Sequence, residues 1–181
     1  MSRSDHVKTS KRLSYVLRHN PASVEVELDP SGWVDLDVLV KQLKRVGGME
    51  VTKEQIVEVV ETNDKKRFEL IDGRIRAAQG HSVEIELGLA SSVPPPVLWH
   101  GTVAKFIDSI FENGLIAGAR THVHLSADVE TAQAVGSRRG RPVVLQIDAN
   151  AMGCGGHEFF RSANGVWLTA HVPASAITIA R

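Results

Sequence analysis

The run Ser91-Ser92-Val93-Pro94-Pro95-Pro96, near the middle of the chain, constrains its fold more than any other segment. Three successive prolines cannot continue a helix or a central strand, and they favour an extended polyproline II conformation. A length of 181 residues suits one large domain or two small ones. We therefore expect two lobes, residues 1–90 and 97–181, joined by a semi-rigid linker at 91–96.

The first lobe is predicted to contain three helices followed by a hairpin. Apolar residues recur at helical spacing in residues 5–19, and a second helix is expected from Asp35 to the glycines at 47 and 48. The segment Thr52-Lys53-Glu54-Gln55 has the spacing of a capping box and predicts the start of the third helix. Asp72-Gly73 then joins two alternating segments, which is a strong hairpin signal. This order of elements is that of a winged helix.

The second lobe is predicted to consist mostly of strands. Strands are expected at 97–100, 122–126 and 142–147, and Asn164-Gly165 indicates a further hairpin. The helix after the first strand should turn Phe106, Ile107, Ile110 and Phe111 inward and end at Gly114, and Ser126 should cap a helix that runs to residue 134. The whole chain is therefore expected to be α+β, with a small, mixed and strongly bent sheet in this lobe.

Composition excludes several classes of protein. The chain has 21 Lys and Arg and 21 Asp and Glu, so a protein that binds nucleic acid through bulk positive charge is disfavoured. Cys154 is the single cysteine, which excludes an intramolecular disulfide, and we expect a cytoplasmic protein without a signal peptide or membrane span. Positive charge is concentrated locally instead, because residues 1–20 contain five basic side chains against Asp5: Arg3, Lys8, Lys11, Arg12 and Arg18.

The run Arg18-His19-Asn20-Pro21 ends the first predicted helix and has two interpretations. Cations near a helix C-terminus and a following proline are a common way to end a helix, and spacing alone favours that interpretation. Lys11, however, lies seven residues before Arg18 and shares its face of the helix. The pair therefore also indicates a phosphate-binding strip.

Two other basic segments are open to similar alternatives. Residues 63–67, Asn-Asp-Lys-Lys-Arg, form either a solvated charge run or an anion clamp that ends in Arg67. Residues 138–141, Arg-Arg-Gly-Arg, form either a solvated loop or a site for a dinucleotide pyrophosphate or an RNA backbone. No GxGxxG motif follows a strand, so a Rossmann site is not supported.

Histidines and small residues supply the remaining candidates. His100-Gly101-Thr102 lies at a predicted strand end, where glycine lets a ligand approach the backbone and threonine adds a hydroxyl. His122 and His124 share one strand face, but with only a distant His157 their spacing is unspecific, and we expect no metal. Residues 79–82, Gln-Gly-His-Ser, offer flexible backbone and polar donors after the hairpin.

Taken in order, these stretches resemble the RNA 2′-phosphotransferase family. The matching segments are residues 11–21, 32–34, 63–68, 76–82, 98–102, 122–126, 136–140 and 164–168. Each segment alone is a weak signal for the family, and the ordered set of segments is specific to it. The resemblance implies a winged-helix N-terminal lobe, an ADP-ribosyltransferase-like C-terminal lobe, and a tRNA-like RNA substrate that arises in tRNA splicing. It also implies a monomer that uses NAD⁺ as co-substrate and needs no metal.

The resemblance further implies a two-step reaction. The internal 2′-phosphate of the RNA attacks the nicotinamide ribose C1″ of NAD⁺ and expels nicotinamide, which leaves an ADP-ribosylated phosphate. The ribose O2″ then attacks this phosphate, which releases 2′-OH RNA and ADP-ribose 1″,2″-cyclic phosphate. Catalysis is expected to need both lobes.

Site residues are carried over where the motifs match. Arg18, His19 and Arg67 are expected to engage the 2′-phosphate, with His19 as a general acid for the leaving 2′-oxygen. The fourth arginine of the family is assigned to Arg120, and Arg138 and Arg139 remain rival candidates that we also assign to NAD binding. The other expected contacts are with NAD, from His100, Gly101, Thr102 and Ser126, and with RNA, from Lys11, Gln79, His81 and Ser82.

Two other functions are weighed against this one. An ADP-ribosyltransferase that modifies nucleic-acid phosphate ends or protein would share the NAD site, but the late catalytic glutamate of the protein-modifying enzymes has no clear equivalent, Glu158 included. A winged-helix regulator that senses NAD would need a basic recognition helix. The third predicted helix instead carries three acids against Lys53, namely Glu54, Glu58 and Glu61, which disfavours that function.

Overall fold

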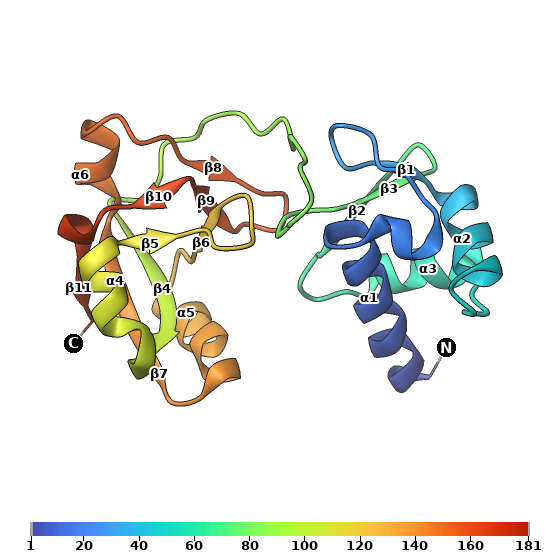
Figure 1. Cartoon of the computed structure of the whole chain (residues 1–181), viewed down its shortest axis with the longest axis horizontal. Helices are drawn as coiled ribbons and strands as arrows, with labels where there is room; N and C mark the ends of the chain where they lie inside the picture. The colour runs from blue at the N-terminus through green and yellow to red at the C-terminus, as the bar shows by residue number, and fades with distance from the viewer. Residues whose placement is uncertain (1, 181) are drawn as a thin grey trace. The chain divides into compact units, whose positions relative to one another are not determined.

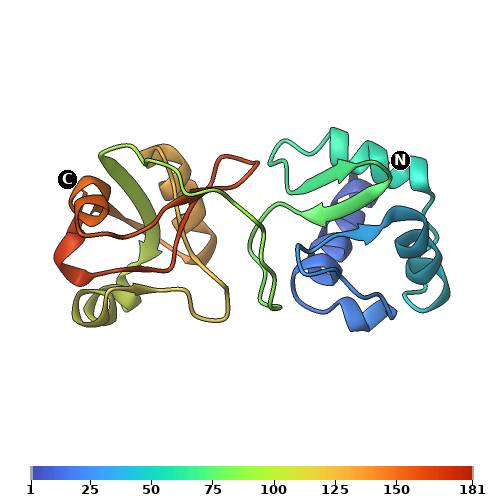
Figure 2. The same cartoon turned by 90° about the horizontal axis from the view of Figure 1, so that it is seen from above.

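The computed structural model describes residues 2–180 and divides the chain into two compact units, Met1–Gly88 and Leu89–Arg181. The elements of each unit can be followed in Figure 1 and, after a turn of 90°, in Figure 2. The division lies three residues before the serine–proline run. Within residues 2–180, no helix is both long enough and apolar enough to cross a membrane.

Unit 1 contains three helices and a three-stranded antiparallel sheet. The helices are α1 (Arg3–Arg18), α2 (Leu36–Arg45) and α3 (Lys53–Glu61), and the short 3-10 turn η1 (Pro21–Val24) follows α1. The strands are β1 (Val34–Asp35), β2 (Phe68–Ile71) and β3 (Arg74–Ala77), in the order β1-β3-β2. The expected three helices and hairpin are confirmed, together with a short first strand that was not predicted.

Local sequence signals account for these elements. The predicted capping box of α3 is present, because the side chains of Thr52 and Gln55 each accept from the other's backbone N–H. Asp72 and Gly73 both have positive φ, 48° and 73°, which suits the tight turn of a two-residue hairpin. Alternation along the hairpin buries Phe68, Ile75 and Ala77 against the helices.

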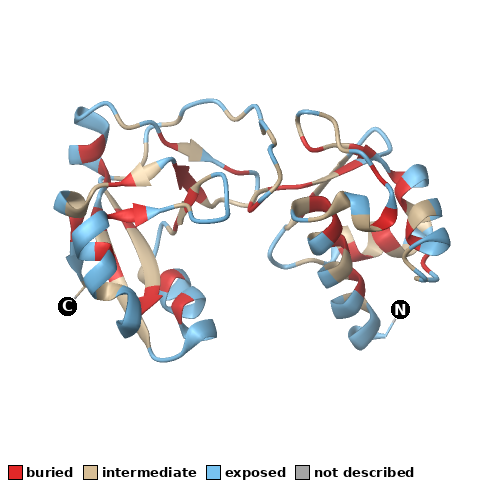
Figure 3. Cartoon of the chain, in the orientation of Figure 1, coloured by how far each residue is buried: buried red, intermediate tan, exposed pale blue. Residues whose placement is uncertain are grey.

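Unit 1 has its own apolar core (Figure 3). Leu13, Val16 and Leu17 form the inward stripe of α1, and Leu39 and Leu43 form that of α2. All five side chains are fully buried, which agrees with the apolar spacing of these helices. The core therefore fixes which face of α1 is left for solvent and ligands.

Unit 2 combines short strands with three short helices. The helices are α4 (Ile107–Asn113), α5 (Val129–Gly136) and α6 (Ala149–Cys154), with 3-10 turns at Ala104–Phe106, Ser137–Arg139 and Ala174–Ala176. The strands are β4 (Val97–Val103), β5 (Leu115–Ile116), β6 (Val123–Leu125), β7 (Pro142–Asp148), β8 (Phe160–Arg161), β9 (Trp167–Thr169), β10 (His171–Val172) and β11 (Ile177–Ile179). The chain is thus α+β, as expected.

The expected single mixed sheet of unit 2 is wrong. The described strands form three separate sheets, β11-β7-β4, β6-β9-β8 and β10-β5, and all their pairings are antiparallel. The first two sheets meet through a bridge at Trp99 and Ser126. Partner choice between short strands depends on tertiary packing, which the strand patterns alone do not contain.

Two local expectations for unit 2 also fail. Phe106 and Phe111 are 36% and 40% exposed, and Ile110 is the buried residue of α4. The helix after β6 begins two residues later than predicted, because the Asp128 side chain, and not that of Ser126, accepts from the N–H of Thr131 at 2.7 Å. Gly114 does end α4, with a φ of 75°.

Candidate functional site

The candidate site in unit 1 is a groove of about 670 Å³ between one face of α1 and the segment that follows α3. We call it the α1 groove. Its lining contains five Lys or Arg side chains and one carboxylate, in a chain whose formal net charge is zero. The lining residues are Arg3, His6, Val7, Ser10, Lys11, Ser14, Tyr15, Arg18, His19, Val59, Thr62, Asn63, Asp64, Lys65 and Arg67.

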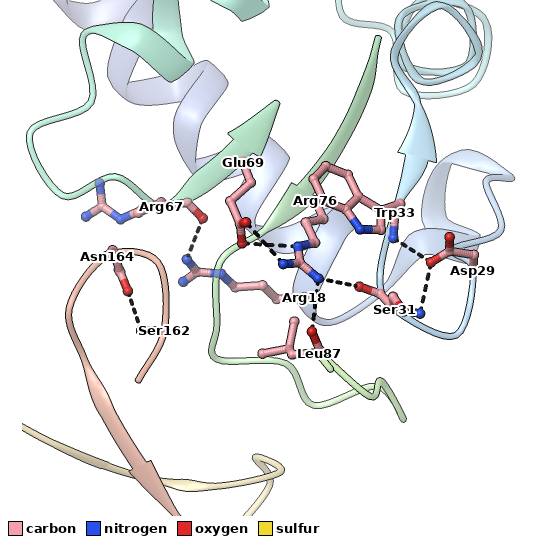
Figure 4. A network of polar contacts seen from close by, with 10 residues as sticks. All are labelled: Arg18, Asp29, Ser31, Trp33, Arg67, Glu69, Arg76, Leu87, Ser162 and Asn164. Atoms are coloured by element: carbon pink, nitrogen blue, oxygen red, sulfur yellow. Dashed lines mark hydrogen bonds and ion pairs between the residues drawn. The ribbon is translucent and has the colours of Figure 1, made fainter. Parts of the chain in front are cut away.

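Arg18 and Arg67 meet at one end of this groove (Figure 4). Arg18 is the last residue of α1, and its Nη2 donates to the backbone carbonyl oxygen of Arg67 at 3.3 Å. The same carbonyl accepts from the N–H of Ala78 at 2.9 Å. The end of α1 is therefore hydrogen-bonded to the start of the hairpin, and the guanidinium groups of both arginines line the α1 groove.

Asn63 orients this pair from the opposite wall. Its Oδ1 accepts from Arg67 Nη1 at 3.4 Å and from the N–H of Lys65 at 3.2 Å, and its Nδ2 donates to Ser10 Oγ on α1 at 3.2 Å. One side chain thus ties the loop, the arginine and the helix together. This role of Asn63 was not predicted from the sequence, although an asparagine that opens a turn is a recognisable signal.

His19 is positioned by the segment that follows the hairpin. Its Nδ1 lies 2.9 Å from Ser82 Oγ, and the N–H of Ser82 donates to the carbonyl oxygen of Arg18 at 2.9 Å. Gly80 adopts a φ of 88°, which a side chain would strain, and passes beside the Arg18 guanidinium. Gln79 lies just before it. The expected motif residues therefore gather at the end of α1.

His81 lies below this surface and not on it. Its side chain is 1% exposed, and both ring nitrogens lack a hydrogen-bond partner among residues 2–180. Burial, reinforced by the positive charges of Arg18, Arg76 and His19, lowers its pKa to about 4. In this structure a neutral imidazole supports the Arg18–His19 end from beneath, and the expected direct contact with RNA is not available to it.

A second arginine of the hairpin is occupied by the fold (Figure 4). Arg76 makes a two-pronged ion pair with Glu69 at 3.1 Å and stacks on the Trp33 ring at 4.6 Å. It also donates to the carbonyl oxygens of Ser31 and Leu87 at 3.3 and 3.2 Å. Arg76 therefore holds the loop before β1 and the segment after the hairpin, while Arg67 is the hairpin arginine that lines the groove.

The candidate site in unit 2 is a cluster of three arginines, Arg120, Arg138 and Arg139. Partial burial lowers the pKa of Arg120, and the positive charges of Arg139 and Arg138 lower it further. Among residues 2–180 none of the three has an ion pair with a carboxylate. Three such cations close together make a local positive field suited to an anionic ligand. The structure places Arg120, Arg138 and Arg139 in one region, so it does not distinguish which of them is the fourth arginine of the expected site.

His100 and His124 border this cluster. The Nδ1 of His100 donates to the backbone carbonyl oxygen of His124 at 3.0 Å, which leaves Nε2 as the acceptor of the neutral ring. Burial lowers the pKa of His100, and Arg139 and Arg120 lower it further, although the bond to His124 opposes the shift. The Nδ1 of His124 lies 3.3 Å from Arg120 Nη1. The sequence pattern suggests only metal binding as a role for His124, so this contact with Arg120 was not predicted.

Gly101 is required by the packing of α5 against β4. It lies within β4 and not at its end, and a Cβ there would lie 1.7 Å from the carbonyl oxygen of Ala132 in α5. Thr102 is buried, and Ser126 exchanges backbone hydrogen bonds with Trp99 at 2.7 and 2.9 Å. These three expected NAD contacts therefore build the frame that holds His100.

The histidines of unit 2 show no metal-like geometry. No group of three or more His, Cys, Asp or Glu side chains within residues 2–180 is arranged to hold a metal ion. His122 packs edge-on against Phe160, with ring centroids 5.8 Å apart, and partial burial lowers its pKa.

Comparison with known proteins places this geometry in context. Residues 4–171 match the family described as RNA 2′-phosphotransferase, Tpt1/KptA family. A protein of Pseudomonas fluorescens is 51% identical over 98% of both chains, and one of Streptomyces coelicolor is 49% identical over 96% of this chain and 95% of its own. A protein of Hahella chejuensis is 48% identical over 94% of this chain and 92% of its own. All three carry the name "Probable RNA 2′-phosphotransferase".

Proposed function

Because the chain belongs to the RNA 2′-phosphotransferase, Tpt1/KptA family, whose activity is RNA 2′-phosphate transfer, we propose that it uses NAD⁺ as the acceptor. The substrate is an internal 2′-phosphate of a tRNA-like RNA. The products are 2′-OH RNA, nicotinamide and ADP-ribose 1″,2″-cyclic phosphate. The observation that carries the proposal is the meeting of Arg18 and Arg67 at one end of a basic groove.

The two units have different parts in this proposal. Unit 1 is a winged-helix lobe that binds the RNA phosphate, and its three helices followed by a β-hairpin support this assignment. Unit 2 is an ADP-ribosyltransferase-like lobe that binds NAD, and its arginine cluster beside His100 supports that one. The reaction needs residues of both units.

Arg18 and Arg67 bind the 2′-phosphate. The phosphate is already an anion, so the first step depends on positioning more than on a strong base. Two guanidinium groups can each grip phosphate oxygens through paired N–H donors. Asn63 and the shared carbonyl of Arg67 limit the movement of both side chains, which reduces the entropy lost when the substrate binds.

His19 donates the proton that the RNA 2′-oxygen needs when it leaves. Ser82 engages Nδ1 of the ring, so Nε2 is the atom that faces the reaction. Negative charge accumulates on phosphorus in this second step, and the neighbouring guanidinium groups of Arg18 and Arg67 stabilise it. Neutral His81 beneath them adds no opposing or competing charge.

The arginine cluster fits the diphosphate of NAD, because Arg120, Arg138 and Arg139 lie close together and have no ion-paired carboxylate within residues 2–180. When bound, NAD⁺ supplies an electrophilic ribose carbon and the adjacent hydroxyl. His100, with Nε2 as acceptor, can hold a hydroxyl group of the ligand. One arginine of the cluster, which we assign as Arg120, also neutralises charge on the transferred phosphate.

Single substitutions in each unit test this function. We expect Arg18→Ala, Arg67→Ala and Arg120→Ala each to reduce turnover of a 2′-phosphorylated RNA with NAD⁺ by about 100-fold or more, the usual cost of one preorganised donor. Arg74→Ala is the control, since this exposed hairpin arginine pairs with Asp29 and lies outside the groove lining. Circular dichroism checks folding. Wild-type activity in both Arg18→Ala and Arg67→Ala would remove the assigned site.

A further inference from the structure

The α1 groove continues well beyond Arg18, and we propose that it binds a single-stranded RNA segment flanking the 2′-phosphorylated nucleotide. This inference rests on the proposed function for the position of the reactive phosphate. It adds a binding subsite along α1 before Arg18, formed by Arg3, Val7, Ser10 and Tyr15.

The length of the groove exceeds what a phosphate needs. Arg3, Val7, Ser14 and Arg18 all line it, and they recur at helical spacing along one face of α1. Fifteen residues of helix separate Arg3 from Arg18, which corresponds to about 22 Å at 1.5 Å per residue. At a rise of about 3.4 Å per nucleotide in one stacked strand, this distance covers roughly six nucleotides.

The positive charge along the groove is complementary to the negative charge of an RNA backbone. Arg3 and Lys11 lie on the α1 wall before Arg18, and Lys65 lies on the opposite wall beside Arg67. Asp64 is the one carboxylate among the lining residues. A row of cations that extends away from the reactive phosphate attracts the neighbouring phosphates of the same strand.

Exposed apolar side chains between the cations favour unpaired bases. Tyr15 is 43% exposed, and its ring is fixed by the Arg12 guanidinium at 5.7 Å and by Asn20, whose amide donates to its hydroxyl at 3.1 Å. Val7 is 49% exposed about two turns away. A base that stacks on Tyr15 must be unpaired, which favours a single strand over a duplex.

The walls of the groove are tied together, so the subsite exists before RNA binds. His6 Nε2 lies 3.0 Å from Glu58 on α3, and its Nδ1 lies 3.4 Å from the Thr62 hydroxyl. Ser10 bonds Asn63 at the middle of the groove. A preformed groove loses little entropy on binding, so additional nucleotides should add affinity.

The test compares 2′-phosphorylated RNAs of different length: a dinucleotide, an octamer extended on the 5′ side and an octamer extended on the 3′ side. Fluorescence anisotropy without NAD⁺ measures binding, and turnover with NAD⁺ gives KM and kcat. We expect one octamer to bind about tenfold or more tightly than the dinucleotide, the contribution of at least one stacked base. Tyr15→Ala should remove most of that gain.

Arg3→Ala and Lys8→Ala form a matched pair, because both remove one charge from α1 but Lys8 does not line the groove. Arg3→Ala should weaken octamer binding about three- to fivefold, more than it weakens dinucleotide binding, and lower the slope of log octamer affinity against log salt by about 0.7. Lys8→Ala should change the octamer affinity and the salt slope each by less than twofold. Equal effects of the two variants, or an octamer that binds no better than the dinucleotide, would overturn the subsite. Length-dependent binding without turnover would instead contradict the proposed NAD-dependent function.

Discussion

Arg18 contacts three separate segments of unit 1. It ends α1, its backbone carbonyl accepts from Ser82, and its guanidinium group donates to the carbonyl oxygen of Arg67. His81 lies beneath it and Gly80 beside it. The position of this one cation is therefore fixed by contacts with several parts of unit 1.

At the residue scale, His81 makes the stability of the protein depend on pH. Its pKa is about 4 in the fold, against about 6.5 for an unperturbed histidine. Between these values the unfolded chain binds a proton that the folded chain excludes, so stability should fall as the pH decreases from about 6.5 to 4. We expect His81 to contribute at most about 3 kcal/mol to this loss, measured by urea denaturation across the range.

One variant separates His81 from other titrating groups. His81→Asn should flatten the pH dependence of unfolding between pH 6.5 and 4 relative to the wild type. The same slope in His81→Asn as in the wild type would show that the buried imidazole is not the group that resists protonation.

The sequence shows which residues belong to the candidate site but not how deeply each side chain is buried. Lys11 and Arg18 could be placed on one face of a helix because helical periodicity assigns faces directly. His81 could not be placed in this way, since a Gly-His-Ser segment is typical of an exposed loop. Its burial depends on the packing of that loop against Gly32 and the end of α1. Asn63 was missed for a similar reason, because its bonds reach residues distant in sequence.

At the element scale, the contact between β4 and α5 fixes His100 and the arginines that follow α5. Gly101 allows this contact, because any Cβ would overlap the backbone of Ala132. Gly136, on α5, lies against the same strand, where a Cβ would meet the Thr102 carbonyl oxygen at 2.9 Å. Close approach of helix and strand is therefore the physical reason for both glycines.

Gly101→Ala should consequently destabilise unit 2 strongly. Overpacking against rigid backbone should cost at least about 3 kcal/mol, the upper part of the usual range for overpacked cores. Gly153→Ala is the matched control, because a Cβ added to Gly153 in α6 would meet no atom within 4 Å, and alanine should stabilise that helix by about 0.5–1 kcal/mol. Thermal denaturation measures both. Normal stability of Gly101→Ala would contradict the packing explanation.

Elements specified by neighbouring residues were the predictable ones. The capping box at Thr52 and Gln55 and the turn at Asp72 and Gly73 are local signals, and both are present. The division of unit 2 into three antiparallel sheets was not predictable, because strands of two or three residues such as β5 and β10 carry little pattern of their own. The later start of α5 at Asp128 reflects competition between two acceptable caps.

At the scale of the whole molecule, charge is balanced overall and separated locally. Lys and Arg equal Asp and Glu in number, yet the α1 groove and the cluster of Arg120, Arg138 and Arg139 are both strongly positive. Each unit also has its own apolar core. The chain thus has two positively charged regions, each on a unit with its own core, and this agrees with the proposed reaction between two phosphate-bearing substrates.

The most direct test of the central claim is one incubation of the protein with NAD⁺, EDTA and an oligonucleotide carrying one internal 2′-phosphate, followed by mass analysis of every product. We expect RNA that has lost its phosphate, together with nicotinamide and ADP-ribose 1″,2″-cyclic phosphate in equal amounts. Dephosphorylation that proceeds without NAD⁺, or RNA that keeps a stable ADP-ribose adduct as the end product, would contradict it.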